Sequence, residues 1–200
     1  MEEQQKKTKI YPRAPEFIIF TGPMFGSKTT RLIATLDRFR YQNREILAFK
    51  PSLDERYSES SICTHNGGKI NAHIVKVGED IIRIINDTGD VDVIAVDEAF
   101  MIEGIAKILL QLFRQGKTIV VSSLQLSASG NVFEEMRDMM PWATKIEICP
   151  AVCTVTGLDA YYTHRKFKEM KEITVGGSDL YEPRCWFHHS FMNQSDFFKE

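Results

Sequence analysis

The chain has 200 residues, of which 43% are hydrophobic and 26% are charged, and its formal net charge is −2. A chain of this length can bury a core and form one domain with a small appendage, while its near-neutral charge gives no general electrostatic case for binding nucleic acid or a membrane. Four unevenly placed cysteines and the lack of an apolar run of membrane-spanning length argue against a secreted disulfide scaffold and predict a cytoplasmic protein.

An apolar run at 17–20 predicts the first strand, and the mostly polar residues 1–14 before it predict a mobile N-terminal extension. The run breaks at a glycine and leads into a segment whose apolar residues recur at helical spacing. A glycine-containing loop between a strand and a helix is typical of phosphate binding, because its main-chain N–H groups point at the phosphates. The candidate phosphate-binding residues are Gly22, Pro23, Met24, Phe25, Gly26, Ser27, Lys28, Thr29 and Thr30.

Lys28 and Thr29 have distinct predicted roles in this loop. In phosphate-binding loops the lysine ammonium reaches the β- and γ-phosphates, and the hydroxyl that follows holds Mg²⁺. The pattern G-x-x-x-x-G-K-[ST] requires a glycine before the lysine, but Ser27 occupies that position and Gly26 lies one place early. A serine in a left-handed backbone costs about 1–2 kcal/mol, so we expect a weakened phosphate site. The alternative is an ordinary surface turn that contains a lysine.

A second strand is predicted at 45–50, followed by a polar segment at 52–69 that contains few apolar residues. Such a segment between strands is either a mobile excursion or a lid over a functional site. Arg56 within it is a candidate phosphate contact, and the alternative is a solvated loop arginine. A further strand at 70–77 and a short helix at 80–86 are predicted next.

A buried strand at 91–96 ends in two acidic residues, Asp97 and Glu98. An apolar strand that delivers a carboxylate at its end, in a chain with a phosphate-binding loop, is the Walker B arrangement. Asp97 is therefore predicted to bind Mg²⁺, and Glu98 to accept a proton from a substrate hydroxyl. An acidic helix cap after the strand is the structural alternative.

The rest of the first 148 residues continues the alternation of helix and strand. We predict a helix at 102–113, a strand at 117–124, a helix at 133–140 and a strand at 144–148. This alternation predicts an α/β fold with a P-loop, RecA-like and mostly parallel sheet that is flanked by helices and connected by right-handed crossovers.

Cysteine and histidine change the character of the chain after this point. Cys185 and His188 have the Cys-x-x-His spacing of two ligands to one zinc ion, and Cys153 is a third candidate. Cys149 and His189 are the alternatives for the fourth ligand. Without a metal, Cys149 and Cys153 would be buried apolar side chains. The predicted domain boundaries are 1–14 (extension), 15–148 (P-loop α/β domain), 149–192 (small zinc-binding domain) and 193–200 (flexible tail).

Several further motifs follow one another in a fixed order. They are Gly22-Pro23-Met24-Phe25, Lys50-Pro51, Asp54-Glu55-Arg56-Tyr57-Ser58, Thr64-His65-Asn66-Gly67, Val96-Asp97-Glu98-Ala99, Ala151-Val152-Cys153, Tyr162-Thr163-His164-Arg165 and Val175-Gly176-Gly177-Ser178-Asp179-Leu180-Tyr181-Glu182-Pro183-Arg184-Cys185. This ordered set, from about residue 17 to residue 188, resembles the type II thymidine kinase family.

The resemblance implies transfer of the γ-phosphoryl group of ATP to the 5′-hydroxyl of thymidine or deoxyuridine, with Mg²⁺, in a homotetramer that dTTP inhibits. It also implies that Glu98 is the general base and that Arg56 lies near the phosphates. A loop between the zinc ligands, called the lasso, would span about 157–184 and close over the nucleoside. The implied nucleoside contacts are Met24, Met101, Leu124, Ala128, Phe133, Thr163, Val175, Gly176 and Tyr181.

The chain departs from the family pattern around the implied site. Besides Ser27, the departures are Phe100 for a glutamine, Met101 for an aromatic residue, Gln125 and Ala128 for an aspartate and an aromatic residue, and Thr156 for a zinc-binding cysteine. Loss of two aromatic side chains predicts a wider base pocket and a looser nucleoside choice. Two alternatives stay open: a catalytically impaired nucleotide-binding relative with altered nucleoside specificity, and a P-loop ATPase that acts on nucleic acid, against which the lack of a basic stripe argues.

Overall fold

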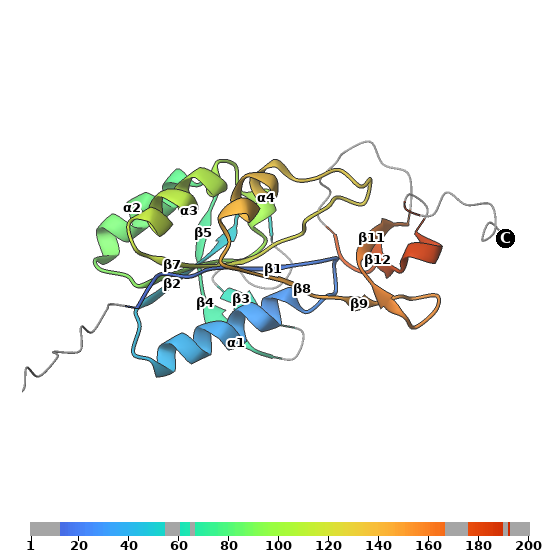
Figure 1. Ribbon diagram of the computed structural model, residues 1–200, viewed down its shortest axis with the longest axis horizontal. Helices are drawn as coiled ribbons and strands as arrows, with labels where there is room; N and C mark the ends of the chain where they lie inside the picture. Colours follow the sequence, from blue (N-terminus) through green and yellow to red (C-terminus); the bar gives the residue numbers. More distant parts are fainter. Residues whose placement is uncertain (1–12, 55–60, 65–66, 167–175, 190–191, 193–200) are drawn as a thin grey trace, which may run out of the picture.

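A computed structural model describes residues 13–54, 61–64, 67–166, 176–189 and 192 of the chain (Figure 1). Two predicted site residues, Arg56 and Val175, lie outside these ranges. Nearly all of the predicted extension at 1–14, and the whole of the predicted tail at 193–200, also lie outside them.

A six-stranded sheet with strand order β5-β2-β6-β7-β1-β8 forms the centre of the molecule. Each neighbouring pair of strands in it runs parallel. The strands are β1 (Phe17–Thr21), β2 (Ile46–Pro51), β5 (His73–Val75), β6 (Val93–Val96), β7 (Thr118–Ser122) and β8 (Lys145–Ile148). The predicted parallel sheet is therefore confirmed, and the strands that carry the phosphate loop and the acid pair end at the same edge of it.

Helices cover both faces of this sheet. The helix α1 (Lys28–Tyr41) lies on one face, and α2 (Glu79–Thr88), α3 (Ile105–Arg114) and α4 (Glu134–Met139) lie on the other (Figure 1). Successive side chains of a strand point to opposite faces, so Ile18 joins the core under α1 while Ile19 joins the core under α3. Leu32 and Leu36 are fully buried, as their helical spacing predicts. None of the helices in the described residues has the length and apolar character needed to cross a bilayer.

Two predicted elements are wrong in their bounds. The strand predicted at 70–77 is divided, because β4 (Lys69–Asn71) pairs antiparallel with β3 (Ser61–Cys63) while β5 joins the central sheet. A hairpin partner inside the polar segment takes the first residues of that run before the chain reaches the sheet. The helix predicted from residue 102 starts later, since a 3₁₀ turn, η1 (Ala99–Met101), comes first and Gly104, with φ of 73°, precedes α3.

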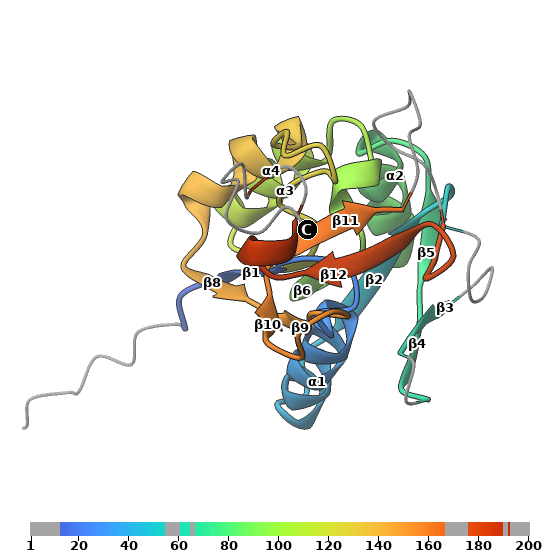
Figure 2. The same cartoon turned by 90° about the vertical axis from the view of Figure 1, so that its right-hand side faces the viewer.

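Short antiparallel strands form the C-terminal part of the molecule, beyond the carboxyl ends of the parallel strands (Figure 2). They are β9 (Ala151–Val152), paired with β10 (Asp159–Ala160), and β11 (Tyr162–Arg165), paired with β12 (Tyr181–Arg184). A 3₁₀ turn, η3 (Trp186–His188), follows them. The main-chain N–H of Met24 donates to the Thr163 hydroxyl at 3.0 Å. This bond connects the C-terminal part directly to the phosphate loop.

Candidate active site

The loop between β1 and α1 contains two non-glycine residues in the left-handed conformation, Phe25 with φ of 66° and Ser27 with φ of 58°. The Lys28 side chain is not in solvent, because the residue is only 6% exposed. Its ammonium group donates to the Pro23 carbonyl oxygen at 2.6 Å. The lysine is therefore held against its own loop, which disfavours the alternative of an ordinary surface turn.

The carbonyl oxygen of Cys149, just after β8, lies against this loop. A Cβ atom added to Gly26 would come within 2.3 Å of that oxygen, and one added to Gly22 would come within 2.4 Å. Both distances are too short for any side chain, so the two positions need glycine. The close approach of Cys149 thus explains a glycine at position 26, while Ser27 takes the left-handed conformation for which glycine is normally used.

Replacing Ser27 with glycine is expected to stabilise the protein by about 0.5–1 kcal/mol. Relief of a left-handed backbone gains about 1–2 kcal/mol, and the extra freedom of glycine in the unfolded chain costs about 0.5–1 kcal/mol. Urea denaturation of the two proteins measures the difference. The matched control is Ser27→Ala, which keeps the Cβ atom and should give no gain; equal stability of the two variants would contradict the expectation.

Asp97 and Glu98 follow β6 at the carboxyl edge of the sheet. The Thr29 hydroxyl donates to the Asp97 carboxylate, at 3.1 Å from Oδ1 and 3.3 Å from Oδ2, and the Ser122 hydroxyl donates to Oδ1. Burial raises the pKa of Asp97 to about 7, and the negative charge of Glu98 acts in the same direction. Glu98 has a left-handed backbone with φ of 50°, a strained conformation that is common at functional sites.

A cavity of about 360 Å³ brings the phosphate loop and the acid pair together. The predicted site residues in its lining are Met24, Phe25, Gly26, Ser27, Lys28, Thr29, Thr30, Asp97 and Glu98. Phosphoryl transfer depends on a phosphate-holding loop, a metal-binding carboxylate and a base around one space. The residues predicted for each of these roles therefore line one cavity.

The same cavity is lined by residues that the sequence did not single out as site residues. They include Lys50 and Asp54, and the short segments 61–64 and 177–179. The Lys50 ammonium lies 3.9 Å from an Asp54 carboxylate oxygen, and both side chains are buried. The sequence did contain a signal for Lys50, because it is a charged residue near the carboxyl end of a buried parallel strand, where ligands bind in such sheets.

Four residues predicted to contact the nucleoside pack on the core beneath α3. Met24, Met101 and Phe133 are partly buried against this cluster, and Leu124 belongs to it. The ring of Phe133 lies 4.5 Å from the ring of Phe100, centroid to centroid. Phe100, one of the departures from the family pattern, thus extends the apolar core toward the predicted nucleoside side of the site.

The other predicted nucleoside contacts come from later segments. Thr163 is buried and bonds to the main chain of Met24, which lines the cavity. Tyr181 is buried in β12, and Gly176 and Ala128 are half-buried. The structure therefore brings Thr163 to the phosphate loop, while it gives Gly176 and Ala128 no contact that identifies a role.

The predicted zinc ligands are brought together only in part. Cys153 and Cys185 share a small buried cluster, and the Cys185 sulfur lies 3.6 Å from His188 Nδ1 and 3.6 Å from the Thr156 hydroxyl. Burial acts to raise the pKa of Cys153, but hydrogen bonds from Thr156 and from main-chain groups lower it to about 6. Among the described residues, however, no group of three or more His, Cys, Asp or Glu side chains is arranged to hold a metal ion. The zinc prediction is therefore not confirmed.

The two alternatives for the fourth zinc ligand have other contacts. Cys149 belongs to the core under α1, and its sulfur lies 3.7 Å from the Glu147 carbonyl oxygen. The His189 ring is engaged by the main chain on both sides, with Nε2 at 3.0 Å from the Thr163 carbonyl oxygen and Nδ1 at 3.3 Å from the Met192 N–H. Core packing therefore accounts for Cys149, and hydrogen bonds to the main chain account for His189, without a metal ion.

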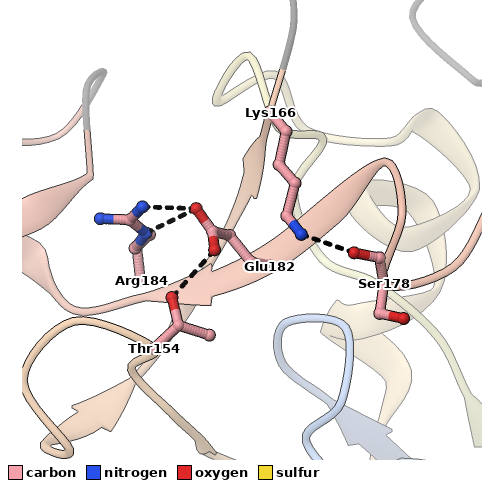
Figure 3. Close-up of polar contacts among 5 residues, drawn as sticks. All are labelled: Thr154, Lys166, Ser178, Glu182 and Arg184. Carbon is pink, nitrogen blue, oxygen red and sulfur yellow. Dashed lines mark hydrogen bonds and ion pairs between the residues drawn. The ribbon is translucent and has the colours of Figure 1, made fainter.

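Polar contacts fix the turn that brings 177–179 to the cavity (Figure 3). The Lys166 ammonium, just after β11, donates to the Ser178 carbonyl oxygen at 2.6 Å. On β12, Glu182 accepts hydrogen bonds from the Thr154 hydroxyl and from the Arg184 guanidinium. Burial acts to raise the pKa of Glu182, but these two hydrogen bonds and the positive charges of Arg184 and Lys166 together hold the pKa below its ordinary value.

A strand, a loop and a helix, with an acid pair in the same cavity, are the arrangement of a P-loop nucleotide-binding protein. The thymidine kinase family model matches residues 16–189. The chain belongs to the thymidine kinase family.

Two relatives from archaea are similar over most of the chain. The thymidine kinase of Pyrobaculum aerophilum is 35% identical over 180 residues, which are 86% of this chain and 97% of that protein. The thymidine kinase of Thermococcus kodakarensis is 34% identical over 181 residues, which are 86% of this chain and 92% of that protein. The similarity therefore includes both the parallel sheet and the C-terminal strands.

Proposed function

We propose that the chain transfers the γ-phosphoryl group of ATP to the 5′-hydroxyl of thymidine or deoxyuridine. The observation that carries this proposal is the shared cavity, which Lys28 of the phosphate loop and the acid Glu98 line together. Membership of the thymidine kinase family supports thymidine as the acceptor. Family membership does not favour the two alternatives from the sequence, a catalytically impaired relative and an ATPase that acts on nucleic acid.

Each charged group has a defined task in this reaction. Glu98 takes the proton of the 5′-hydroxyl as the phosphoryl group is transferred, because a neutral alcohol is a poor nucleophile. Lys28 and the N–H groups of the loop offset the negative charge of the phosphoryl group in the transition state. Arg56 is proposed to lie near the phosphates on the strength of the family resemblance.

Thr29 and Asp97 fit an Mg²⁺ ion that binds together with ATP. Mg²⁺ usually takes one or two carboxylates, phosphate oxygens and waters, so it does not need three protein ligands. The Thr29 hydroxyl lies 3.1 Å from an Asp97 carboxylate oxygen, so the two groups converge on one point. When bound, the ion neutralises charge on the β- and γ-phosphates.

The activity is tested with purified protein, labelled ATP, Mg²⁺ and a nucleoside. Thymidine monophosphate is expected as the product, and ATP turnover that does not depend on thymidine would contradict the proposal. Parallel reactions with deoxyuridine and deoxycytidine measure the nucleoside choice. Since Met101 and Ala128 replace aromatic residues of the family pattern, we propose that this choice is looser than in the family.

The nucleoside site is proposed to include the residues named from the resemblance, with the segment 157–184 as the lasso over the nucleoside. The bond from Met24 to Thr163 supports this placement, because it brings β11 to the phosphate loop. A homotetramer and inhibition by dTTP are proposed on the same resemblance. We also propose a kinase domain at 15–148 and a smaller domain at 149–192, from the change in residue types along the chain, and a cytoplasmic location, from the few and unevenly placed cysteines. Light scattering with and without dTTP tests the assembly.

Zinc binding by Cys153, Cys185 and His188 stays a prediction. A structural zinc ion takes four ligands, and the Thr156 hydroxyl lies 3.6 Å from the Cys185 sulfur, so a cysteine at position 156 would bring a further thiolate close to Cys185. Elemental analysis is expected to find zinc that Cys185→Ser loses, and Thr156→Cys is expected to hold it more tightly against a chelator. If neither the unmodified protein nor Thr156→Cys contains zinc, the prediction is wrong.

A further inference from the structure

A row of buried polar residues crosses the sheet at its carboxyl edge. The parallel register pairs Val96 of β6 with Phe49 of β2 on one side and with Val121 of β7 on the other. The residues that follow are Lys50 after Phe49, Asp97 after Val96 and Ser122 after Val121. Because side chains alternate along a strand, all three point to the face that α1 covers. The register therefore puts Asp97 between an ammonium group and a hydroxyl.

The Ser122 hydroxyl makes direct contact with this carboxylate. Ser122 is fully buried, and its hydroxyl donates to Asp97 Oδ1. Thr29, at the start of α1, donates to the same carboxylate from the cavity side. Asp97 is thus held by one hydroxyl from the sheet and one from the phosphate loop. The first of these is fixed by the backbone of a central strand.

An aspartate carboxylate turns easily about its last side-chain bond, so its direction depends on the groups that hold it. The negative charges of Glu98 and Asp54 act on Asp97 across the site, while Lys50 stands beside it in the sheet. Without the Ser122 hydroxyl, the Asp97 carboxylate would lose the hydrogen bond that ties Oδ1 to β7. Thr29, which donates to both carboxylate oxygens from the cavity side, does not by itself fix how the carboxylate is turned.

We infer that Ser122 is a positioning residue, whose hydroxyl orients the Asp97 carboxylate for a nucleotide-bound Mg²⁺ ion. This inference rests on the proposed function for the identity of the nucleotide, but not for the geometry of the carboxylate. Groups that hydrogen-bond to a metal ligand without contacting the metal typically contribute about 10- to 100-fold to metal affinity or activity. Ser122 does not line the cavity, so it acts through Asp97 and not on the substrates.

The test compares Ser122→Ala with Thr118→Val. Thr118 is a fully buried hydroxyl on the same strand and the same face, at the opposite end of β7. Calorimetry measures the dissociation constant of ATP with Mg²⁺ and with EDTA for each protein. Ser122→Ala is expected to lose about 10- to 100-fold in affinity with Mg²⁺ and to bind as the unmodified protein does in EDTA. Thr118→Val is expected to keep both values.

Each other outcome is decisive. Unchanged Mg²⁺-dependent binding in Ser122→Ala, an equal loss in Thr118→Val, or no Mg²⁺ dependence in the unmodified protein would overturn the inference. If Ser122→Ala does not fold, Ser122→Cys, which is nearly the same size and a weak donor, should show a smaller loss of the same kind. If the protein fails to phosphorylate thymidine while Ser122→Ala still loses Mg²⁺-dependent binding, the proposed function fails and the role of Ser122 stands.

Discussion

Replacing Glu98 with glutamine is expected to lower the rate of thymidine phosphorylation by about 100- to 10,000-fold, the usual contribution of a general base. Glutamine keeps the size of the side chain but cannot take the proton of the 5′-hydroxyl. Because Glu98 lines the cavity that Lys28 and Asp97 share, the loss should fall on the catalytic rate and not on the affinity for ATP. Steady-state rates with labelled ATP, together with calorimetry, separate the two quantities.

The matched control for this prediction is Glu103→Gln. Glu103 is an exposed acid five positions further along the chain, and it does not line the cavity. It should keep full activity. If Glu98→Gln retained the rate of the unmodified protein, Glu98 would not be the base, and the acid pair would have to be reassigned to metal binding alone.

Replacing Asp97 with asparagine is expected to stabilise the metal-free protein at pH 8. Burial raises the pKa of Asp97 to about 7, so between about pH 4 and pH 7 the folded state binds a proton that the unfolded state has already released. Stability therefore falls as the pH rises through this range, and above it the folded protein carries the full cost of a buried charge. Asparagine removes that cost, which is of the order of a few kcal/mol.

The expected gain depends on pH in a definite direction. Urea denaturation in EDTA should show a large stabilisation by Asp97→Asn at pH 8 and a small one near pH 4. Thr118→Val, which removes a buried hydroxyl and no titratable group, should change stability by a similar amount at both values. A gain that is the same at both pH values would show that the carboxylate is not the cause. The variant should also lose Mg²⁺-dependent ATP binding.

The features that follow from short stretches of sequence could be predicted. The apolar run before Gly22, the helical spacing of Leu32 and Leu36 and the strand before Asp97 each determine their own element. Parallel strands that end at one edge then bring Lys28 and Asp97 to a common cavity. The large sheet and the centre of the site were therefore accessible from local patterns.

Features that depend on contacts between distant residues could not be predicted. The hairpin of β3 and β4 divides a run that looks like one strand, and its pairing partner at 61–63 carries no strong strand pattern. The role of Ser122 appears only when the register places it beside Asp97, 25 residues earlier in the chain. The Cys-x-x-His spacing indicated candidate zinc ligands, but spacing does not reveal whether three ligands and Thr156 suffice.

The carbonyl oxygen of Cys149 makes positions 26 and 149 depend on one another in evolution. Exchanging Gly26 and Ser27 would restore the common loop motif, but it would place a side chain within 2.3 Å of that oxygen. The change Ser27→Gly by itself also restores the motif and removes the left-handed serine, so it needs no change at position 26. Position 26 is therefore expected to stay glycine in descendants until the chain after β8 has moved away, while position 27 can change independently of it.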